Sequence, residues 1–250
     1  TSCIGVVFDG TGYGVDGAVW GGEFLLCKDT AYERCAHLNY VKLCGGDSAA
    51  KNAELVAYCY LSVAGEAVDN SEYSAIRSAI TNNINTQQFS SMGRLFDAVS
   101  AVLKLKTENS FEGECAIALE NSAADFEKSG REPYPLKFSV EYNDAGAKID
   151  QIDLLKTIFL AAKSGADIGA LALGFHRAIA EMVLAVCEYI RSGSGENAVA
   201  LSGGVFANLL LTEDCACRLT NAGFNVCLNS AVPTNDGGIS LGQAWLCRNI

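Results

Sequence analysis

The stretch FDGTGYGVDGAVWGGEF, residues 8–24, contains six glycines, two aspartates and one glutamate within seventeen positions. It joins two segments that are typical of strands, CIGVVF at 3–8 and AVWGGEFLLC at 18–27. A third such segment, ERCAHLNYVKL at 33–43, follows after a polar turn. The sequence therefore predicts that the chain begins with an antiparallel meander of three strands.

Glycine-rich turns of this kind can bind anions, because several backbone N–H groups are free to point into one concavity. A second such turn, LSGGVFAN at 201–208, lies between a predicted strand and a predicted helix, whose N-terminus adds partial positive charge. Neither turn has the lysine of a P-loop or fits G-x-G-x-x-G followed by a helix. A calcium loop starting at Asp9 is excluded, since Thr11, Tyr13 and Trp20 occupy liganding positions. Two interpretations remain: a nucleotide or phosphate site, or plain structural turns.

The middle of the chain has a helical period. From about residue 47 to 192 we expect a large helical insertion, interrupted by a loop at 132–138 that carries two of the three prolines. One long amphipathic helix is predicted by apolar residues three or four positions apart, namely Leu171, Phe175, Ile179, Met182, Val186 and Tyr189. At least six helices are expected in the whole chain.

The C-terminal part is predicted to be a β-α-β unit followed by one more helix. NAVALSGG reads as a buried strand, NLLLTEDCACRLTNAG as a helix closed by Gly223, and FNVCLNS as a second, parallel strand. TNDGG then opens a final helix, which Asn235 or Asp236 can cap.

Composition excludes several classes of partner. The 250 residues carry a net charge of −11, so nucleic acid is not expected to bind. The most apolar region, 154–190, contains charged residues throughout, which argues against a membrane span.

The odd number of cysteines, eleven, and the lack of a secretory leader favour free thiols in the cytoplasm. Cys215 and Cys217 have no second pair with which to form a zinc site, and His37 and His176 are interpreted as structural.

Six separated motifs, in this order, resemble the C-terminal part of the hydrogenase maturation carbamoyltransferase family, HypF. The likeness extends from Ile4 to about Ala244, and its motifs are IGVVFDGTGYGVDGAVWGGEF, SSMGRLFDAVSAVL, FEGECAIALE, GFHRAIAE, LSGGVFANLLL and NDGGISLGQA. The resemblance implies an α/β lobe of the actin-like ATPase, ribonuclease-H-like kind, similar to TsaD, with a mixed sheet. It also implies that the glycines of the first motif let two strands bend around a nucleotide's phosphates.

What the resemblance implies about function is carbamoyl transfer in the maturation of nickel-iron hydrogenase. Carbamoyl phosphate and ATP, with Mg, give carbamoyl adenylate in another domain, and the lobe helps to transfer the carbamoyl group to the C-terminal cysteine of a partner, HypE. Positioning and electrostatics can supply most of this chemistry. No catalytic residue is assigned.

The site residues follow by match to the family's motifs. Expected to line the nucleotide phosphates are Asp9, Gly10, Thr11, Gly12 and Tyr13. Asp97 and Gly113 are expected on the ribose side, and Gly203, Gly204 and Asn208 are expected to close over the nucleotide. Asp236 is expected to be a metal ligand. Structural alternatives stay open, because Asp97 could be a solvated helix residue and both Asn208 and Asp236 could be helix caps.

The sequence also departs from the family's pattern. The resemblance implies a divalent metal, Fe or Zn, held partly by two histidines upstream of FDGTG, and only Thr1 to Val7 precede that motif here. We therefore interpret the chain as a fragment, residues 1–250 being the C-terminal lobe of a longer transferase, and expect the metal only in the full-length enzyme. Two alternatives are an O-carbamoyltransferase acting on a small-molecule hydroxyl and a non-catalytic nucleotide-binding module.

Overall fold

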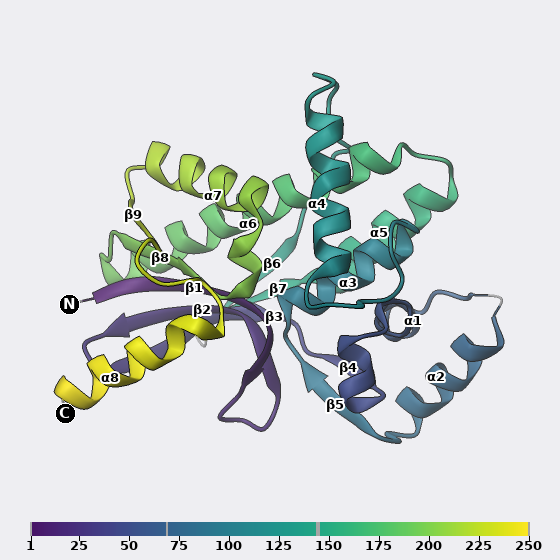
Figure 1. Ribbon diagram of the computed structural model, residues 1–250, viewed down its shortest axis with the longest axis horizontal. Coiled ribbons are helices and arrows are strands. Elements are labelled where there is room, and N and C mark those ends of the chain that lie inside the picture. The colour runs from purple at the N-terminus through teal and green to yellow at the C-terminus, as the bar shows by residue number, and fades with distance from the viewer. Residues whose placement is uncertain (1, 69, 144–145, 250) are drawn as a thin grey trace.

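The computed structural model describes residues 2–68, 70–143 and 146–249 and shows a mixed sheet with helices around it (Figure 1). The strands are β1 (Ser2–Tyr13), β2 (Val19–Lys28), β3 (Ala31–Leu38), β4 (Val41–Cys44), β5 (Thr86–Phe89), β6 (Ser139–Asn143), β7 (Gly146–Asp150), β8 (Ala198–Ser202) and β9 (Asn225–Leu228). The α-helices are α1 (Ala53–Val63), α2 (Ser71–Thr81), α3 (Met92–Val102), α4 (Glu114–Glu127), α5 (Gln151–Lys163), α6 (Ile168–Ser194), α7 (Leu209–Asn221) and α8 (Ile239–Asn249).

The predicted meander is confirmed. Strands β1, β2 and β3 pair antiparallel in sequence order. The third segment is shorter than predicted, because the chain leaves the ladder after Leu38: Asn39 donates its N–H to Ile149 O, and its own carbonyl accepts from Gln151 Nε2. Residues 41–44 then form β4, which pairs with β5 beside the main sheet.

The expected helical insertion at 47–192 needs one correction. Three strands lie inside it, and β6 and β7 extend the main sheet, whose order is β6-β7-β3-β2-β1-β8-β9. Strand β7 pairs parallel with β3. These strands are only four or five residues long and carry only one or two apolar residues each, so the pattern is too short to mark a strand in sequence. The loop at 132–138 contains no helix or strand, as predicted.

The C-terminal β-α-β unit is confirmed as well. Strands β1, β8 and β9 are parallel neighbours, and α7 connects β8 to β9. In Figure 1 α6 and α7 lie together on one side of these strands. Helix α6 is long and apolar enough to span a bilayer by length and composition, but 78% of its apolar window is buried in the protein, as in a core helix. The expected minimum of six helices is exceeded among the described residues, which form eight α-helices.

The last helix begins as the sequence predicts. Asn235 Oδ1 accepts the N–H of Gly237 at 3.1 Å and so caps a short 3-10 turn, Asp236–Gly238, that leads into α8. Several apolar side chains of α8 are more than one third exposed, among them Leu241 and Trp245.

Candidate nucleotide-binding site

A bulge in β1 turns the FDGTG motif out of the sheet. Phe8 pairs with Gly22 and Gly12 with Trp20, so three residues of β1 stand opposite the single residue Gly21 of β2. A side chain at Gly21 would collide with the carbonyl oxygen of Asp9, which explains the glycine there. The bulge leaves Asp9, Gly10 and Thr11 free to face a cavity.

The second glycine-rich turn meets this bulge directly. Gly203 has a φ of 101°, and a Cβ on it would collide with the carbonyl oxygen of Phe8. The next residue, Gly204, lies beside the carboxylate of Asp9, with Asp9 Oδ1 only 3.3 Å from where its Cβ would stand. Phe206 stacks on Phe8 with ring centroids 5.3 Å apart. The two glycine-rich turns identified in the sequence are thus packed against each other. Only glycine at position 203 allows the second turn to approach the carbonyl of Phe8 this closely.

Helix α3 supplies the third wall. Ser91 caps it by accepting the N–H of Arg94 at 3.1 Å, and the same hydroxyl lies 3.0 Å from Asp9 O and 2.7 Å from Gly10 O. Gly93 packs against the bulge so closely that a Cβ there would be 2.8 Å from Gly10 Cα. The start of α3 and the FDGTG bulge are therefore held as a unit.

Arg34 supports the hairpin from behind. Its Nε donates to the buried carboxylate of Glu23 at 2.6 Å, and its guanidinium lies over the Trp20 ring, 4.0 Å from the centroid. Ser90, which precedes the α3 cap, donates to the same Glu23 carboxylate at 2.5 Å. These contacts hold β2 against the residues that lead into α3. The side chains that make them do not line the cavity described next.

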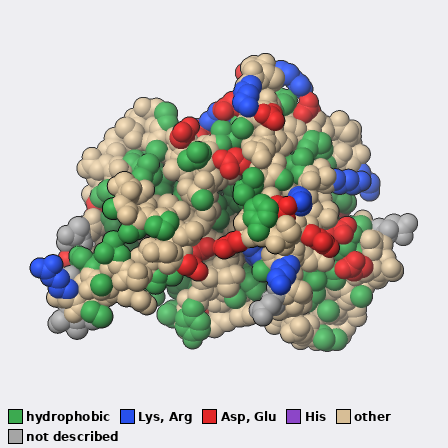
Figure 2. Space-filling model, viewed as in Figure 1, with side chains coloured by type: hydrophobic (Ala, Val, Ile, Leu, Met, Phe, Trp, Pro, Cys, Tyr) green, Lys and Arg blue, Asp and Glu red, His purple; other side chains and the backbone are tan. Residues whose placement is uncertain are grey.

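Two adjoining cavities, each of about 300 Å³, open between these walls. They share Asp9, Gly10, Arg94, Glu112, Gly113 and Asn235. The first has an apolar side formed by Ala116, Ile117 and Val205, and the second reaches Thr11, Lys51 and Asp236. On the face shown in Figure 2, acidic side chains form a band across the middle. We call the joined cavities the nucleotide cavity.

Carboxylates dominate the charge of this cavity. The pKa of Asp9 is raised, chiefly by burial, and further by the neighbouring carboxylates of Asp236 and Glu112, while the N–H groups of Gly10 and Gly204 oppose the rise. Gly10 donates to Asp9 Oδ1 at 2.7 Å. A phosphate would be repelled by these carboxylates unless a divalent cation lay between them, and carboxylate oxygens are the ligands that Mg²⁺ prefers.

The residues present fit a nucleotide and a bridging Mg²⁺. Lys51 borders the cavity and can pair with phosphate oxygens, and the apolar side can receive a nucleoside. A transition-metal site fits less well, because the described part of the chain holds no group of three or more His, Cys, Asp or Glu side chains able to bind a metal. Asp236 itself is exposed.

Asp97 and Asn109 lie at the floor of the cavity. Asp97 is 2% exposed, its Oδ2 lies 3.0 Å from Arg94 Nη2, and its Oδ1 accepts from Asn109 Nδ2 at 3.0 Å. Asn109 also donates its N–H to Lys51 O and accepts the N–H of Cys115 at 2.8 Å. Asp97 therefore holds together α3, the start of α4 and the segment around Lys51, which excludes the solvated-face alternative.

The structure gathers most of the predicted site residues at this cavity. Asp9, Gly10, Thr11, Asp97, Gly113, Gly204, Asn208 and Asp236 line it. Gly203 lies beneath it, Gly12 is paired with Trp20, and Tyr13 points to solvent with 92% of its surface exposed. Asn208 is also a helix cap, accepting the N–H of Leu211 at 2.9 Å, which confirms the cap interpretation, while its contact with a nucleotide stays a prediction.

Sequence reasoning missed Arg94, Glu112, Lys51 and Asn235 as cavity residues. A signal existed for the first two, since Arg94 stands three residues before Asp97 on one helix and Glu112 precedes Gly113. All eleven cysteines are free, and in the C-x-C pair Cys215 is buried whereas Cys217 is exposed.

The comparisons with known proteins decide the family. Residues 5–243 match the family described as "Carbamoyltransferase, Kae1-like Domain, second subdomain". The chain belongs to the HypF carbamoyltransferase family. It is 33% identical to the carbamoyltransferase HypF homolog of Cupriavidus necator, over 97% of this chain and 64% of that protein. It is 37% identical to carbamoyltransferase HypF of Rhodobacter capsulatus, over 96% of this chain and 31% of that one.

Solved HypF structures share the fold. A crystal structure of full-length HypF in the phosphate- and nucleotide-bound form matches with a TM-score of 0.90 at 37% identity, covering 99% of this chain and 33% of that one. The HypF structure from T. kodakarensis matches with a TM-score of 0.84 at 30% identity, over 98% of this chain and 33% of that one. The predicted α/β lobe of the actin-like, ribonuclease-H-like kind is confirmed. The chain spans 31% to 64% of the length of these HypF proteins.

Proposed function

We propose that this chain is the nucleotide-binding lobe of a carbamoyltransferase that acts in the maturation of nickel-iron hydrogenase. Its donor is carbamoyl adenylate, made from carbamoyl phosphate and ATP, and its acceptor is the C-terminal cysteine of HypE. The single observation that carries the proposal is the close contact between the two glycine-rich turns. Gly203 packs against the carbonyl oxygen of Phe8, where a Cβ would collide, and Gly204 lies beside the Asp9 carboxylate.

The geometry supports a held nucleotide. Asp9, Gly10 and Thr11 would face the phosphates through the bulge, with Gly12 and Tyr13 continuing the hairpin. Gly113 is the N-cap residue before α4 and would approach the ribose, and Asp97 would act from the floor of the cavity. Gly204 and Asn208 would cover the other side of the nucleotide. An Mg²⁺ ion between Asp9, Asp236 and the phosphates would remove the repulsion that the carboxylates exert.

The transfer itself is an acyl substitution. The thiol loses its proton, the thiolate sulfur attacks the carbamoyl carbon, and the bond from that carbon to the phosphate oxygen breaks. AMP leaves with the electron pair, and an S-carbamoyl cysteine remains. The lobe contributes by holding the phosphate still and by keeping water from the carbamoyl carbon.

We further propose that the chain works as part of a longer protein in the cytoplasm. The HypF relatives are longer than this chain, and free thiols at all eleven cysteines suit a reducing compartment. Asp236 would bind a divalent metal, Fe or Zn, together with ligands outside these 250 residues, because one carboxylate cannot hold such an ion alone.

The test uses the full-length enzyme with ATP, Mg²⁺, carbamoyl phosphate and HypE, and follows the acceptor by mass spectrometry. We expect one carbamoyl group on the C-terminal cysteine and none on an acceptor that ends in serine. The variant Asp9→Ala should lose the transfer, while Asp125→Asn, an exposed position on α4, should keep it. Transfer to a small-molecule hydroxyl, or nucleotide binding with no transfer to either acceptor, would contradict the proposal.

A further inference from the structure

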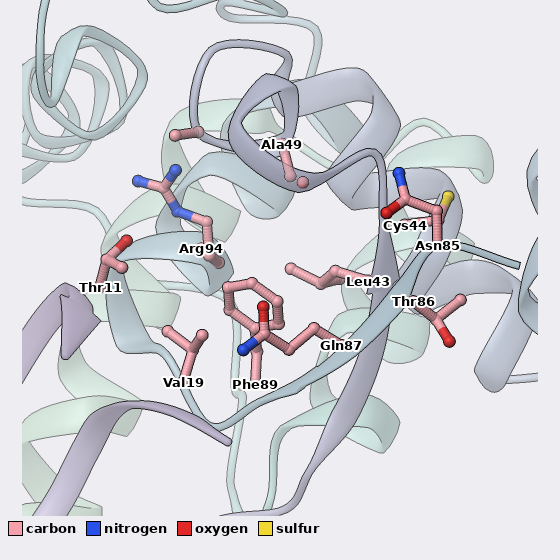
Figure 3. A pocket seen from close by; sticks show the side chains of 12 residues that line it. Thr11, Val19, Leu43, Cys44, Ala49, Asn85, Thr86, Gln87, Phe89 and Arg94 are labelled. Atoms are coloured by element: carbon pink, nitrogen blue, oxygen red, sulfur yellow. The ribbon is translucent and has the colours of Figure 1, made fainter. Parts of the chain in front are cut away.

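A third cavity, of about 280 Å³, adjoins the nucleotide cavity (Figure 3). It opens between the β1–β2 hairpin, the β4–β5 pair and the short 3-10 helix Gly46–Ala50. Thr11 and Arg94 border both this cavity and the nucleotide cavity, so the two share a wall. In Figure 3 the guanidinium of Arg94 lies at the margin, on the same side as Thr11. We call this space the side cavity.

The side cavity and the nucleotide cavity differ in charge. Asp9, Glu112, Glu120 and Asp236 border the nucleotide cavity. The side cavity has no carboxylate among the described residues that line it, and Arg94 is their one formal charge. The rest of its lining is apolar, as at Val19, Leu43 and Phe89, or neutral and polar, as at Asn85 and Gln87. An anionic group with an apolar neighbour therefore fits the side cavity.

Two of the three guanidinium nitrogens of Arg94 have no hydrogen-bond partner among the described residues. Its Nη2 lies 3.0 Å from Asp97 Oδ2, while Nε and Nη1 are buried without a hydrogen-bond partner among the described residues. Buried guanidinium donors are costly to leave unpaired, and hydrogen bonds from a guanidinium to a carboxylate are among the stronger ones in proteins. Asp97 fixes the side chain, so Arg94 is positioned before any ligand arrives.

From these observations we infer that the side cavity receives the end of the acceptor chain and that Arg94 binds its terminal carboxylate. The inference rests on the proposed function. In a C-terminal cysteine the carboxylate carbon is bonded to the same Cα as the thiol-bearing Cβ. A cation on the wall between the two cavities can therefore hold the carboxylate while the thiol reaches the nucleotide side. Val19, Leu43 and Phe89 would contact the residue before the cysteine.

The experiment uses full-length enzyme and two forms of the acceptor protein, made by ligating synthetic tails that end in cysteine as the free acid or as the amide. With the wild-type enzyme we expect the amide to raise KM for the acceptor by about ten- to a hundred-fold, with a smaller change in kcat. Arg94→Met combined with Asp97→Asn avoids an uncompensated buried carboxylate. This double variant should raise KM for the free acid to the level of the amide, and Arg94→Lys should recover part of the discrimination.

Three outcomes would overturn the inference. Equal KM values for acid and amide with the wild-type enzyme would remove the carboxylate from recognition. Undiminished discrimination in the double variant would show that Arg94 does not bind the carboxylate. In both cases transfer continues, so the proposed function stands. An enzyme that carbamoylates neither acceptor contradicts the proposed function itself, and the inference falls with it. Circular dichroism of each variant establishes that it is folded.

Discussion

Asn208 Nδ2 lies 3.0 Å from His176 Nε2, and both side chains are buried. His176 Nδ1 lies 2.8 Å from Ala172 O, which assigns the ring proton to Nδ1 and leaves Nε2 to accept from the amide. Asn208 also caps α7 and lines the nucleotide cavity. The neutral imidazole on α6 therefore orients a cavity residue, and protonation of Nε2 would set two donors against each other.

The first prediction concerns acid stability. Burial lowers the pKa of His176 from 6.5 to about 4. Between pH 6.5 and pH 4, the unfolded chain therefore binds a proton at this residue that the folded chain does not bind. Stability from this residue is present above pH 6.5 and is lost as the pH falls toward 4, by up to about 1.4 kcal/mol per pH unit. Urea unfolding across this range measures the slope, and His176→Gln should make it shallower. Equal slopes in the two proteins would rule out this role.

The second prediction concerns Gly203. Alanine at this position needs a φ near 101° and places Cβ against the carbonyl of Phe8, so β1 and the LSGG turn must move apart. We expect Gly203→Ala to lower the free energy of unfolding by more than about 2 kcal/mol. Gly195→Ala is the matched control, since Gly195 also has a positive φ but no atom within 4 Å of the added Cβ, and should cost about 1 kcal/mol. Equal losses would show that the approach to Phe8 is not tight.

The third prediction concerns the Arg94–Asp97 pair. Asp97→Ala leaves a buried guanidinium uncompensated and removes the acceptor for Asn109, so unfolding should become easier by about 3 kcal/mol. Asp125→Asn removes a carboxylate whose side chain is 76% exposed and paired with Lys128, and should change stability by less than about 0.5 kcal/mol. Chemical denaturation compares the two. A loss as small as the control's would mean that Asp97 does not hold the cavity floor.

The elements predictable from sequence were those with strong local patterns. The meander, the long helix α6 and the β8-α7-β9 unit combine apolar periodicity with glycine turns, and each formed where expected. Strands β5, β6 and β7 were not predicted, because each has only four or five residues and two of them depend on distant partners: β5 pairs with β4, and β7 is added to β3 across more than one hundred residues.

The residues of the candidate site also fall into those that the sequence reveals and those that only the tertiary fold reveals. Asp9, Gly204 and Asn208 stand in short motifs whose turn chemistry is visible in sequence, and they meet at the cavity. Arg94 and Lys51 enter it only because α3 and the segment before α1 fold against the hairpin. Tyr13 belongs to the same motif and was expected to line the phosphates, yet its side chain projects from the hairpin into solvent. A motif thus predicts the backbone turn better than it predicts which side chains face inward.

The fourth prediction concerns nucleotide binding by the 250-residue chain. We expect weak binding of ATP with Mg²⁺, because the cavity is open on one side, and calorimetry should show the heat disappear in Asp9→Ala combined with Asn208→Ala. Asn208→Ala also removes a helix cap at a cost of about 1 kcal/mol, so the variant's unfolding must be checked. Asp125→Asn should bind as the wild type does. Unchanged binding in the double variant would mean that the two turns are structural only.

The last prediction concerns the metal. Asp236 is exposed, and the nearby carboxylate that its charge affects is Asp9, whose pKa it helps to raise. Two carboxylates suit a transient Mg²⁺ bridged by phosphate, whereas stable Fe or Zn sites use three or four protein ligands, often histidine or cysteine. Elemental analysis of the purified 250-residue chain should therefore find less than stoichiometric iron or zinc, while a protein extended upstream to include further ligands should contain one metal ion that Asp236→Ala removes. One ion per molecule in the shorter chain, lost on Asp236→Ala, would mean that side chains assigned to packing, such as His37 or the cysteines, serve the metal.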